Sequence, residues 1–319
     1  MDLLHSLRAV SEASGTGVVD WAKAGEAAKA STEPGLLELT PADRRGYAAD
    51  VRDARTRLRE IVGVDFDVPD AIEVQNRHHW IDANLATFRN VMGPIEAATN
   101  ARMPGFSRIV NTGSMAFTLG FLARNVLGQY DPLLLADEPD TDHGLYFVHP
   151  NVVSVAADLD VAYPRFRRWI AFHEVTHAAE FGSAPWLPDY LESRVKRGID
   201  ELTAGGLDRS AFEELQTAMT AVEGYAELLM DRAFDDEYED LRRKLDRRRK
   251  GGGPVQRIAR RLLGLGLKRQ QYERGAAFFE HVADERGLEA ASAVWDRPEN
   301  LPTSGEIADP SAWLVRVDP

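Results

Sequence analysis

The stretch PRFRRWIAFHEVTHAAEFG, residues 164–182, contains the pattern His-Glu-x-x-His at residues 173–177. Apolar and aromatic residues recur through this stretch at helical spacing, and His173 and His177 fall on the same stripe. Positions four apart on a helix lie about one turn apart, so both imidazoles point to one side and can share a metal ion. The sequence therefore predicts an inward-facing helix, from Pro164 to about Phe181, that carries two metal ligands and ends at Gly182.

Zinc is the metal that this pattern favours, because His and carboxylate ligands bind Zn²⁺ tetrahedrally and a catalytic site keeps one position for water. Glu174 stands next to His173, where it can activate that water. The chain has no cysteine, so the remaining ligands must be His, Asp or Glu. The alternative is a pair of ordinary core histidines. It is weaker, because the full motif arises by chance in only about one in a hundred such sequences.

A third ligand is expected, because catalytic zinc sites usually have three protein ligands. The metzincin continuation would need a third His at position 183, where this chain has Ser183. A later predicted helix, about residues 210–234, offers Glu223 and Glu227 instead. From the helical repeat, Glu223 lies roughly 60° from the middle of the apolar stripe and Glu227 roughly 100°. Glu223 is the predicted ligand, and Glu227 is the alternative ligand or an outer partner. It stays open whether both are ordinary surface glutamates.

Helical periodicity dominates the rest of the chain, so the predicted fold class is mainly α, with a small β element before the motif helix. The apolar, aromatic and β-branched segments Leu145–Val148 and Val152–Val153 predict one or two strands. The tail from Pro298 is expected to be extended. We expect one domain over residues 1–319, with 1–100 a helical N-terminal part and 101–319 the metal-site part. Further helices are predicted at residues 20–30, 43–62, 70–100, 107–128 and 255–286.

The net charge of −13 argues against general nucleic-acid binding, because a phosphate backbone repels an acidic protein. One basic run, Arg242–Lys250, is the rival indication, but a charge run beside the glycine-rich segment 251–254 is usually a solvated loop. No apolar run is long enough to span a bilayer, and the N-terminus lacks the pattern of a signal peptide. We therefore expect a cytoplasmic location, with no nucleic-acid or membrane partner.

Several segments together resemble the zincin-like metallopeptidase family, whose members are often labelled coenzyme F-420 biosynthesis-associated proteins or hydrolases. They are HEVTH (173–177), VEGYAE (222–227), KRQQYERG (268–275), VHPN (148–151), PW (185–186), VW (294–295) and PENLPT (298–303). The likeness spans about Trp80 to Trp313. The EGYA segment also resembles the one by which many gluzincins supply their third ligand, which agrees with Glu223. The resemblance implies a mostly helical zincin-like fold and a peptidase activity, but no particular reaction.

The predicted function is hydrolysis of a peptide or protein substrate by a gluzincin-type mechanism. A zinc-bound water is activated by Glu174, which then passes the proton to the leaving amine. A second electrophile is usual. The candidates are Tyr225, His149, His281 and Tyr272, with Tyr272 preferred because a phenol can donate to an oxyanion. Leu145–Val148 is a candidate edge strand for the substrate. The alternative function is a zinc-binding, non-proteolytic accessory protein associated with coenzyme F-420 metabolism.

Overall fold

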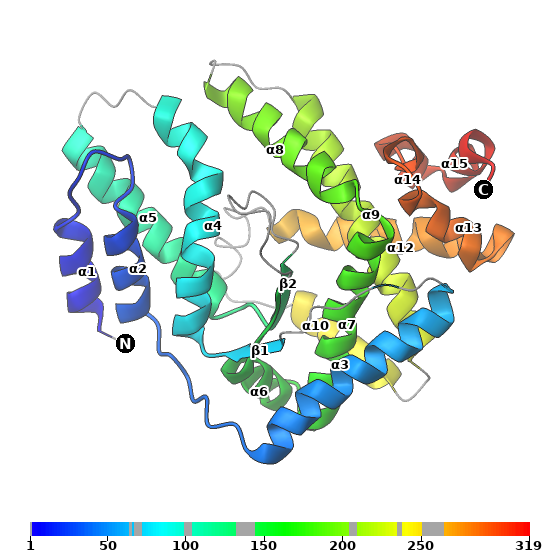
Figure 1. The fold of residues 1–319 in the computed structure, drawn as a ribbon, viewed down its shortest axis with the longest axis horizontal. Coiled ribbons are helices and arrows are strands. Elements are labelled where there is room, and N and C mark those ends of the chain that lie inside the picture. The colour runs from blue at the N-terminus through cyan, green and yellow to red at the C-terminus, as the bar shows by residue number, and fades with distance from the viewer. Residues whose placement is uncertain are drawn as a thin grey trace. The chain divides into compact units, whose positions relative to one another are not determined.

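The computed structural model describes residues 2–63, 66, 72–98, 104–131, 144–203, 209–234, 238–250 and 265–319. Within these ranges the chain is mostly helical and has one three-stranded sheet (Figure 1). The predicted mainly α fold class, with a small β element before the motif helix, is confirmed. None of the described helices has both the length and the apolar character needed to cross a membrane. The chain divides into two compact units, neither of which begins or ends at residue 100.

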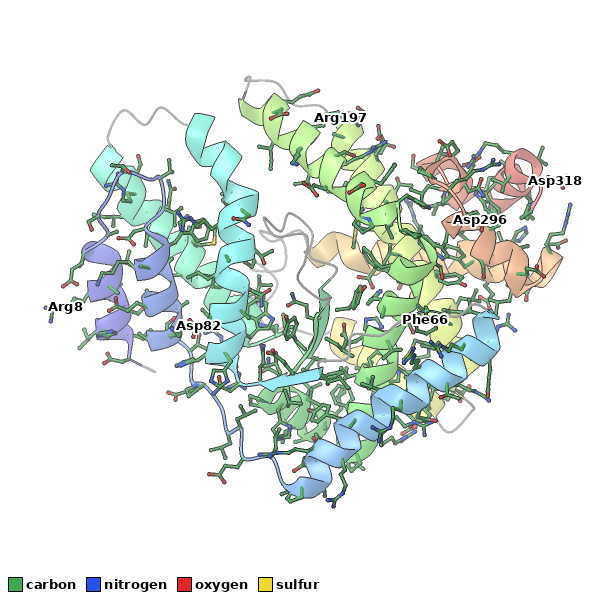
Figure 2. The ribbon with its side chains drawn as sticks, viewed as in Figure 1. Arg8, Phe66, Asp82, Arg197, Asp296 and Asp318 are labelled. Atoms are coloured by element: carbon green, nitrogen blue, oxygen red, sulfur yellow. The ribbon has the colours of Figure 1, made fainter. Side chains whose placement is uncertain are left out.

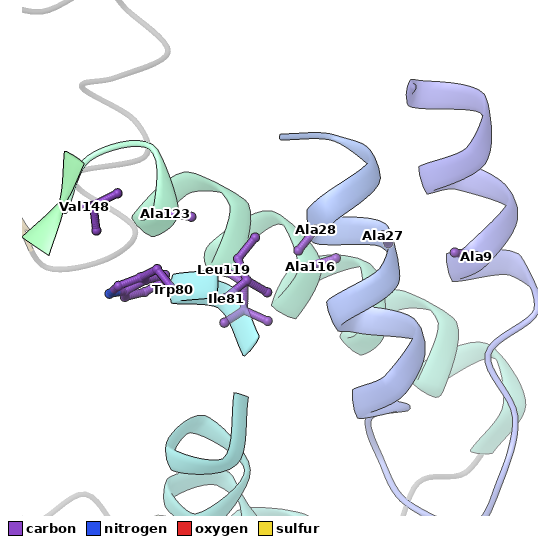
Figure 3. Close-up of a cluster of buried hydrophobic side chains, with 9 residues drawn as sticks. All are labelled: Ala9, Ala27, Ala28, Trp80, Ile81, Ala116, Leu119, Ala123 and Val148. Atoms are coloured by element: carbon purple, nitrogen blue, oxygen red, sulfur yellow. The ribbon is translucent and has the colours of Figure 1, made fainter. Parts of the chain in front are cut away.

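The first unit comprises residues 1–42, 69–155 and 197–207. Its elements are α1 (Leu3–Ser11), α2 (Trp21–Ala30), β1 (Ile72–Gln75), α4 (Arg77–Ala98), α5 (Pro104–Ala123), β2 (Gly128–Asp131), β3 (Gly144–Val148) and the first part of α6 (His149–Asp158). Figure 3 shows its core, where alanines of α1, α2 and α5 meet the larger side chains of Trp80, Ile81 and Leu119. Such small residues let the helices approach closely, so a compact core forms around few large side chains.

The sheet lies in the first unit, with strand order β1-β3-β2. β3 pairs with β1 in parallel and with β2 in antiparallel orientation, so it is the central strand. The expectation that Leu145–Val148 is an edge strand for the substrate is therefore wrong. The predicted strand at Val152–Val153 is also wrong, because these residues lie in α6. Pro150 in the first turn and the spacing of the buried Val152, Val155 and Ala156 favour the helix.

The second unit comprises residues 43–68, 156–196 and 208–319. Its main helices are α3 (Pro41–Val62), α7 (Tyr163–Ser183), most of α8 (Leu187–Thr203), α9 (Arg209–Ala233), α10 (Glu239–Lys250) and α12 (Leu265–Arg286). The short elements that follow are α13 (Leu288–Ser292), η2 (Ala293–Trp295), η3 (Pro298–Asn300), α14 (Ser304–Ala308) and α15 (Pro310–Val317).

Three further sequence predictions differ from the structure. The predicted helix 70–100 contains β1, and α4 begins only at Arg77. The basic run 242–250 lies in α10, not in a loop, because Leu241 and Leu245 bury one face of this helix. The tail beyond residue 298 forms short helices, since Thr303 and Glu306 make a capping box and Pro310 begins α15. Residues 251–264, which include the glycine-rich segment, lie outside the described residues.

The helix α7 is buried on most of its circumference. Its partly exposed positions include a row four residues apart, formed by Arg165, Trp169, His173, His177 and Phe181. The helix continues one residue past Gly182, and that glycine lies against Phe66, which is labelled in Figure 2. A Cβ on Gly182 would come 3.1 Å from the Cβ of Phe66. The two histidines thus lie on a partly exposed strip of α7.

Candidate metal centre

The structure brings three potential ligands together, His173 and His177 from α7 and Glu223 from α9. One ligand atom from each residue lies within 4.8 Å of the other two. In a tetrahedral zinc site with bonds of about 2.0–2.1 Å, ligand atoms are on the order of 3.4 Å apart. The three side chains therefore need only a small convergence to hold one ion. The predicted ligands His173, His177 and Glu223 form this cluster, which we call the triad.

The two candidate glutamates of α9 have different surroundings. Glu223 is 7% exposed and belongs to the triad. Glu227, one turn further along α9, is partly exposed, and its Oε1 accepts a hydrogen bond of 2.7 Å from Arg242. The helical angle estimated from the sequence therefore placed the more buried glutamate correctly. Glu227 is engaged with a guanidinium instead of an imidazole.

Glu223 carries the clearest sign of a missing partner. Its Oε2 is buried and has no hydrogen-bond partner among the residues that the structure describes. An ionised carboxylate oxygen without a partner is costly to bury, because it loses its hydration and gains nothing in return. A divalent cation between Glu223 and the two imidazoles would supply that partner. The donor set of two His nitrogens and one carboxylate also fits a catalytic zinc site.

A fourth residue, Glu180, orients His177. The Nδ1 of His177 lies 2.8 Å from Oε2 of Glu180, whose side chain is fully buried. When Nδ1–H donates to this carboxylate, the lone pair at Nε2 is available for a metal. A carboxylate on the second nitrogen is the usual way in which a metal-binding histidine is held in one tautomer and orientation. Glu180 lies three residues after His177, so both side chains share one face of α7.

The electrostatic setting of His177 favours positive charge. Burial by itself lowers the pKa of His177, but the hydrogen bond and charge of Glu180, with the charges of Glu223 and Glu174, raise the pKa to about 9. Burial raises the pKa of Glu180 to about 7, even though His177 acts against this shift. The strongest charged neighbours of His177 are thus all carboxylates. A site with this balance attracts a cation to the position where the imidazole nitrogens converge.

Glu174, the predicted base, is 7% exposed and directly follows His173 on α7. Its charge is among the causes that raise the pKa of His177. The intervening Thr176 is satisfied locally, since its hydroxyl donates to the backbone oxygen of Phe172 at 2.9 Å. The ring of Trp169 stacks on His173, with centroids 5.6 Å apart and planes 5° from parallel. The indole therefore limits how the imidazole of His173 can rotate.

Two glycines determine how closely the ligand helix α9 packs against α12. A Cβ on Gly224 would come 2.3 Å from the carbonyl carbon of Gly275, and a Cβ on Gly275 would come 2.3 Å from the backbone oxygen of Thr220. Neither contact leaves room for a methyl group. The glycine of the EGYA segment is therefore required by the helix crossing, next to the residue that supplies the ligand.

The structure places the candidates for a second electrophile in different surroundings. The side chain of Tyr272 lies outside the described residues, so its role stays a prediction. Tyr225 is buried, and its hydroxyl lies 2.7 Å from Oγ of Ser292, while burial raises its pKa well above the usual range. His281 lies against α15, with Nε2 3.4 Å from Oγ of Ser311. His149 belongs to the first unit.

Sequence reasoning missed Glu180 and Trp169 as neighbours of the ligands. Glu180 took no part in the sequence argument. Its spacing of three residues from His177 was the signal that could have identified it. Trp169 is one of the aromatic residues in the stretch 164–182, but its stacking on His173 depends on side-chain rotamers that the sequence does not specify.

Comparison with known proteins gives two matches. The sequence model of the family described as zincin-like metallopeptidase matches residues 19–207 and 201–314. A crystal structure described as that of a "putative hydrolase with a novel fold" from Chloroflexus aurantiacus is similar over 100% of this chain and 99% of that chain, with 31% sequence identity and a TM-score of 0.74. No match is found among curated proteins.

Proposed function

Because the chain belongs to the zincin-like metallopeptidase family, we propose that it is a zinc-dependent peptidase of the gluzincin type. The observation that carries this proposal is the buried Oε2 of Glu223, which lacks a hydrogen-bond partner in the described part of the chain and lies with His173 and His177. The family implies a zinc cofactor, and these three residues would hold it. Cleavage of peptide bonds goes beyond what the family match shows and is part of our proposal.

Each residue of the site has a distinct task in this proposal. When bound, the ion supplies Lewis acidity, which lowers the pKa of a water and polarises the scissile carbonyl. The carboxylate of Glu174 takes a proton from that water and hands it to the nitrogen of the leaving amine. Glu180 holds the Nδ1–H of His177, and Trp169 holds the ring of His173. Tyr272 remains the proposed hydrogen-bond donor to the developing oxyanion.

The deciding experiment compares the wild-type chain with Glu174→Gln on a peptide library. We expect Glu174→Gln to retain one zinc per chain but to lose hydrolysis, because glutamine cannot accept the proton. The control is Glu285→Gln, an exposed glutamate of α12, which should keep both properties. Metal analysis and mass spectrometry of the products are the readouts. Unchanged hydrolysis in Glu174→Gln would remove Glu174 from the mechanism.

The same experiment tests the alternative function. Stoichiometric zinc with no turnover of any peptide by the wild-type chain would favour a non-proteolytic accessory protein. Capture of a partner from coenzyme F-420 biosynthesis would support the association with that pathway.

A further inference from the structure

A cavity of about 270 Å³ in the second unit is lined by residues of α7, of α9 with Phe234 just beyond it, and of α10 with Tyr238 just before it. It is smaller than the roughly 300–1,000 Å³ that is typical of sites for drug-sized ligands. The space therefore suits a single side chain of a larger substrate.

The cavity lies next to the triad. Trp169, which lines it, precedes His173 by one turn of α7 and stacks on that imidazole. Glu227, which also lines it, follows Glu223 by one turn of α9. Four residues of a helix rise about 6 Å, a distance that about two residues of an extended peptide span. A substrate with its scissile bond at the triad can therefore insert a neighbouring side chain into the cavity.

The charged lining of the cavity has an excess of carboxylates. Glu227, Asp231 and Glu239 face it together with a single guanidinium, that of Arg242, which gives a net charge of −2. Arg242 is already matched, since it donates to Glu227 at 2.7 Å and pairs with Asp231. A substrate carboxylate would have to compete with both of these acids for Arg242. A cation instead meets net negative charge.

The remaining walls are aromatic, formed by Trp169, Phe234 and Tyr238, with Met230 beside them. Aromatic faces attract guanidinium and ammonium groups through the ring quadrupole. Two of these rings already take part in this interaction with the chain's own arginines. The guanidinium of Arg165 lies 5.0 Å from the ring centroid of Tyr238, and that of Arg168 lies 5.8 Å from the centroid of Phe234. Asp240 and Asp53 balance these two arginines.

We propose that this cavity is a specificity subsite that accepts an arginine or lysine side chain of the substrate, close to the scissile bond. The inference rests on the proposed peptidase function, because it assumes that a peptide crosses the triad. The excess of carboxylates and the aromatic faces would together recognise such a cationic side chain. The carboxylates neutralise the charge, and the rings cover the flat or aliphatic part of the side chain.

The test measures binding, so it does not depend on turnover. Zinc-loaded Glu174→Gln is titrated by calorimetry with blocked hexapeptides that differ at one position. Arginine is compared with citrulline, which has nearly the same shape without the charge, and with glutamate. We expect the arginine peptide to bind about tenfold more tightly than the citrulline peptide, and the glutamate peptide to bind most weakly.

Variants of the residues that line the cavity test whether the cavity causes the preference for arginine. Glu239→Gln removes an exposed carboxylate of the cavity and should lower the arginine-to-citrulline ratio several-fold, whereas Glu285→Gln should leave it unchanged. Tyr238→Leu removes an aromatic face and should lower the ratio, while Tyr238→Phe should retain it. A ratio near one, a preference for glutamate, or no binding of any peptide overturns the subsite.

Turnover by the wild-type chain separates the two proposals. Equal cleavage of the arginine, citrulline and glutamate peptides would leave the peptidase proposal standing and would reject the subsite. A preserved binding preference for arginine with no cleavage of any peptide would reject the peptidase proposal and leave the subsite standing.

Discussion

The two halves of α7 differ in how their charged side chains are paired. The first half carries three arginines, each of which reaches an aspartate of another helix: Arg165 pairs with Asp240, Arg167 with Asp50 and Arg168 with Asp53. The second half carries Glu174 and Glu180, and Glu223 of α9 lies against it. The two histidines are the groups that meet these carboxylates.

This difference distinguishes the half of α7 that carries the candidate metal ligands from the half that carries the arginines. In the first half, buried charges are paired within the protein, even though burial raises the pKa of Asp50. In the second half, Glu223 keeps an oxygen with no partner in the described part of the chain. The guanidinium groups of the first half are thus matched by aspartates, whereas the second half faces a buried carboxylate oxygen that a cation would satisfy.

The largest expected effect is in the second half, at Glu223. Glu223→Gln should weaken zinc binding well beyond the ~10–100-fold that follows from loss of an outer partner, because a ligand itself is removed. In the metal-free protein the change also removes one of the charges that raise the pKa of His177, so stability should be unchanged or lower. Zinc content and urea denaturation in chelator are the measurements. Glu227→Gln is the control and should retain zinc. Zinc loss in that variant instead would make Glu227 the ligand.

The corresponding change in the first half should affect folding and leave the metal in place. Asp50→Asn leaves the buried Arg167 without its carboxylate, which should lower the free energy of unfolding by about 3–5 kcal/mol. Asp53→Asn is the matched control, because Arg168 and Asp53 are more exposed and should contribute less than about 1 kcal/mol. Urea denaturation compares the two. Equal effects would show that burial does not distinguish these pairs.

A smaller effect is expected at Glu180, which acts through His177. Glu180→Gln should weaken zinc binding by about 10–100-fold while the ion remains bound at saturating concentration, because the imidazole loses its fixed orientation. Competition with a chromophoric chelator gives the affinity. Glu285→Gln serves as the reference. An affinity equal to that of the wild-type chain would show that Glu180 has no part in orienting His177.

The pH dependence should also separate the metal-free site from the loaded one. The folded-state pKa of His177, about 9, lies above its ordinary value of 6.5, so its contribution to stability is complete below pH 6.5 and is lost as pH rises towards 9. The raised pKa of Glu180, about 7, acts in the same direction between about pH 4.5 and 7. A bound metal must displace the proton of His177, so zinc affinity should rise over the same range, by up to about tenfold per pH unit.

Thermal unfolding from pH 6 to 9, with and without chelator, measures these opposite trends. The chelated protein should lose stability as pH rises, whereas the zinc-loaded protein should not. Parallel curves for the two samples would mean that His177 does not exchange its proton for the metal.

The helix that carries the His-Glu-x-x-His motif was predictable because its evidence is local. The five-residue motif, the apolar stripe and the residues that end the helix all lie within one segment. Glu223 was predictable for a similar reason, as its angle to an apolar stripe follows from the helical repeat. The strand at Val152–Val153 was mispredicted because β-branched residues favour strands only weakly, and burial of Val152 and Val155 in a helix outweighed that preference. Pairings across elements, such as Arg242 with Glu227, required the three-dimensional structure.

The contact between Gly224 and Gly275 limits how the geometry of the candidate metal centre can vary. Glu223 is adjacent to the crossing, so the separation of α9 and α12 helps to set where its carboxylate lies. Position 275 has no side chain and takes no part in the chemistry. It nevertheless constrains, through the packing of α12 on α9, where the carboxylate of Glu223 lies. Enlarging this residue would therefore push α9 away from α12 and displace Glu223 without altering any candidate ligand.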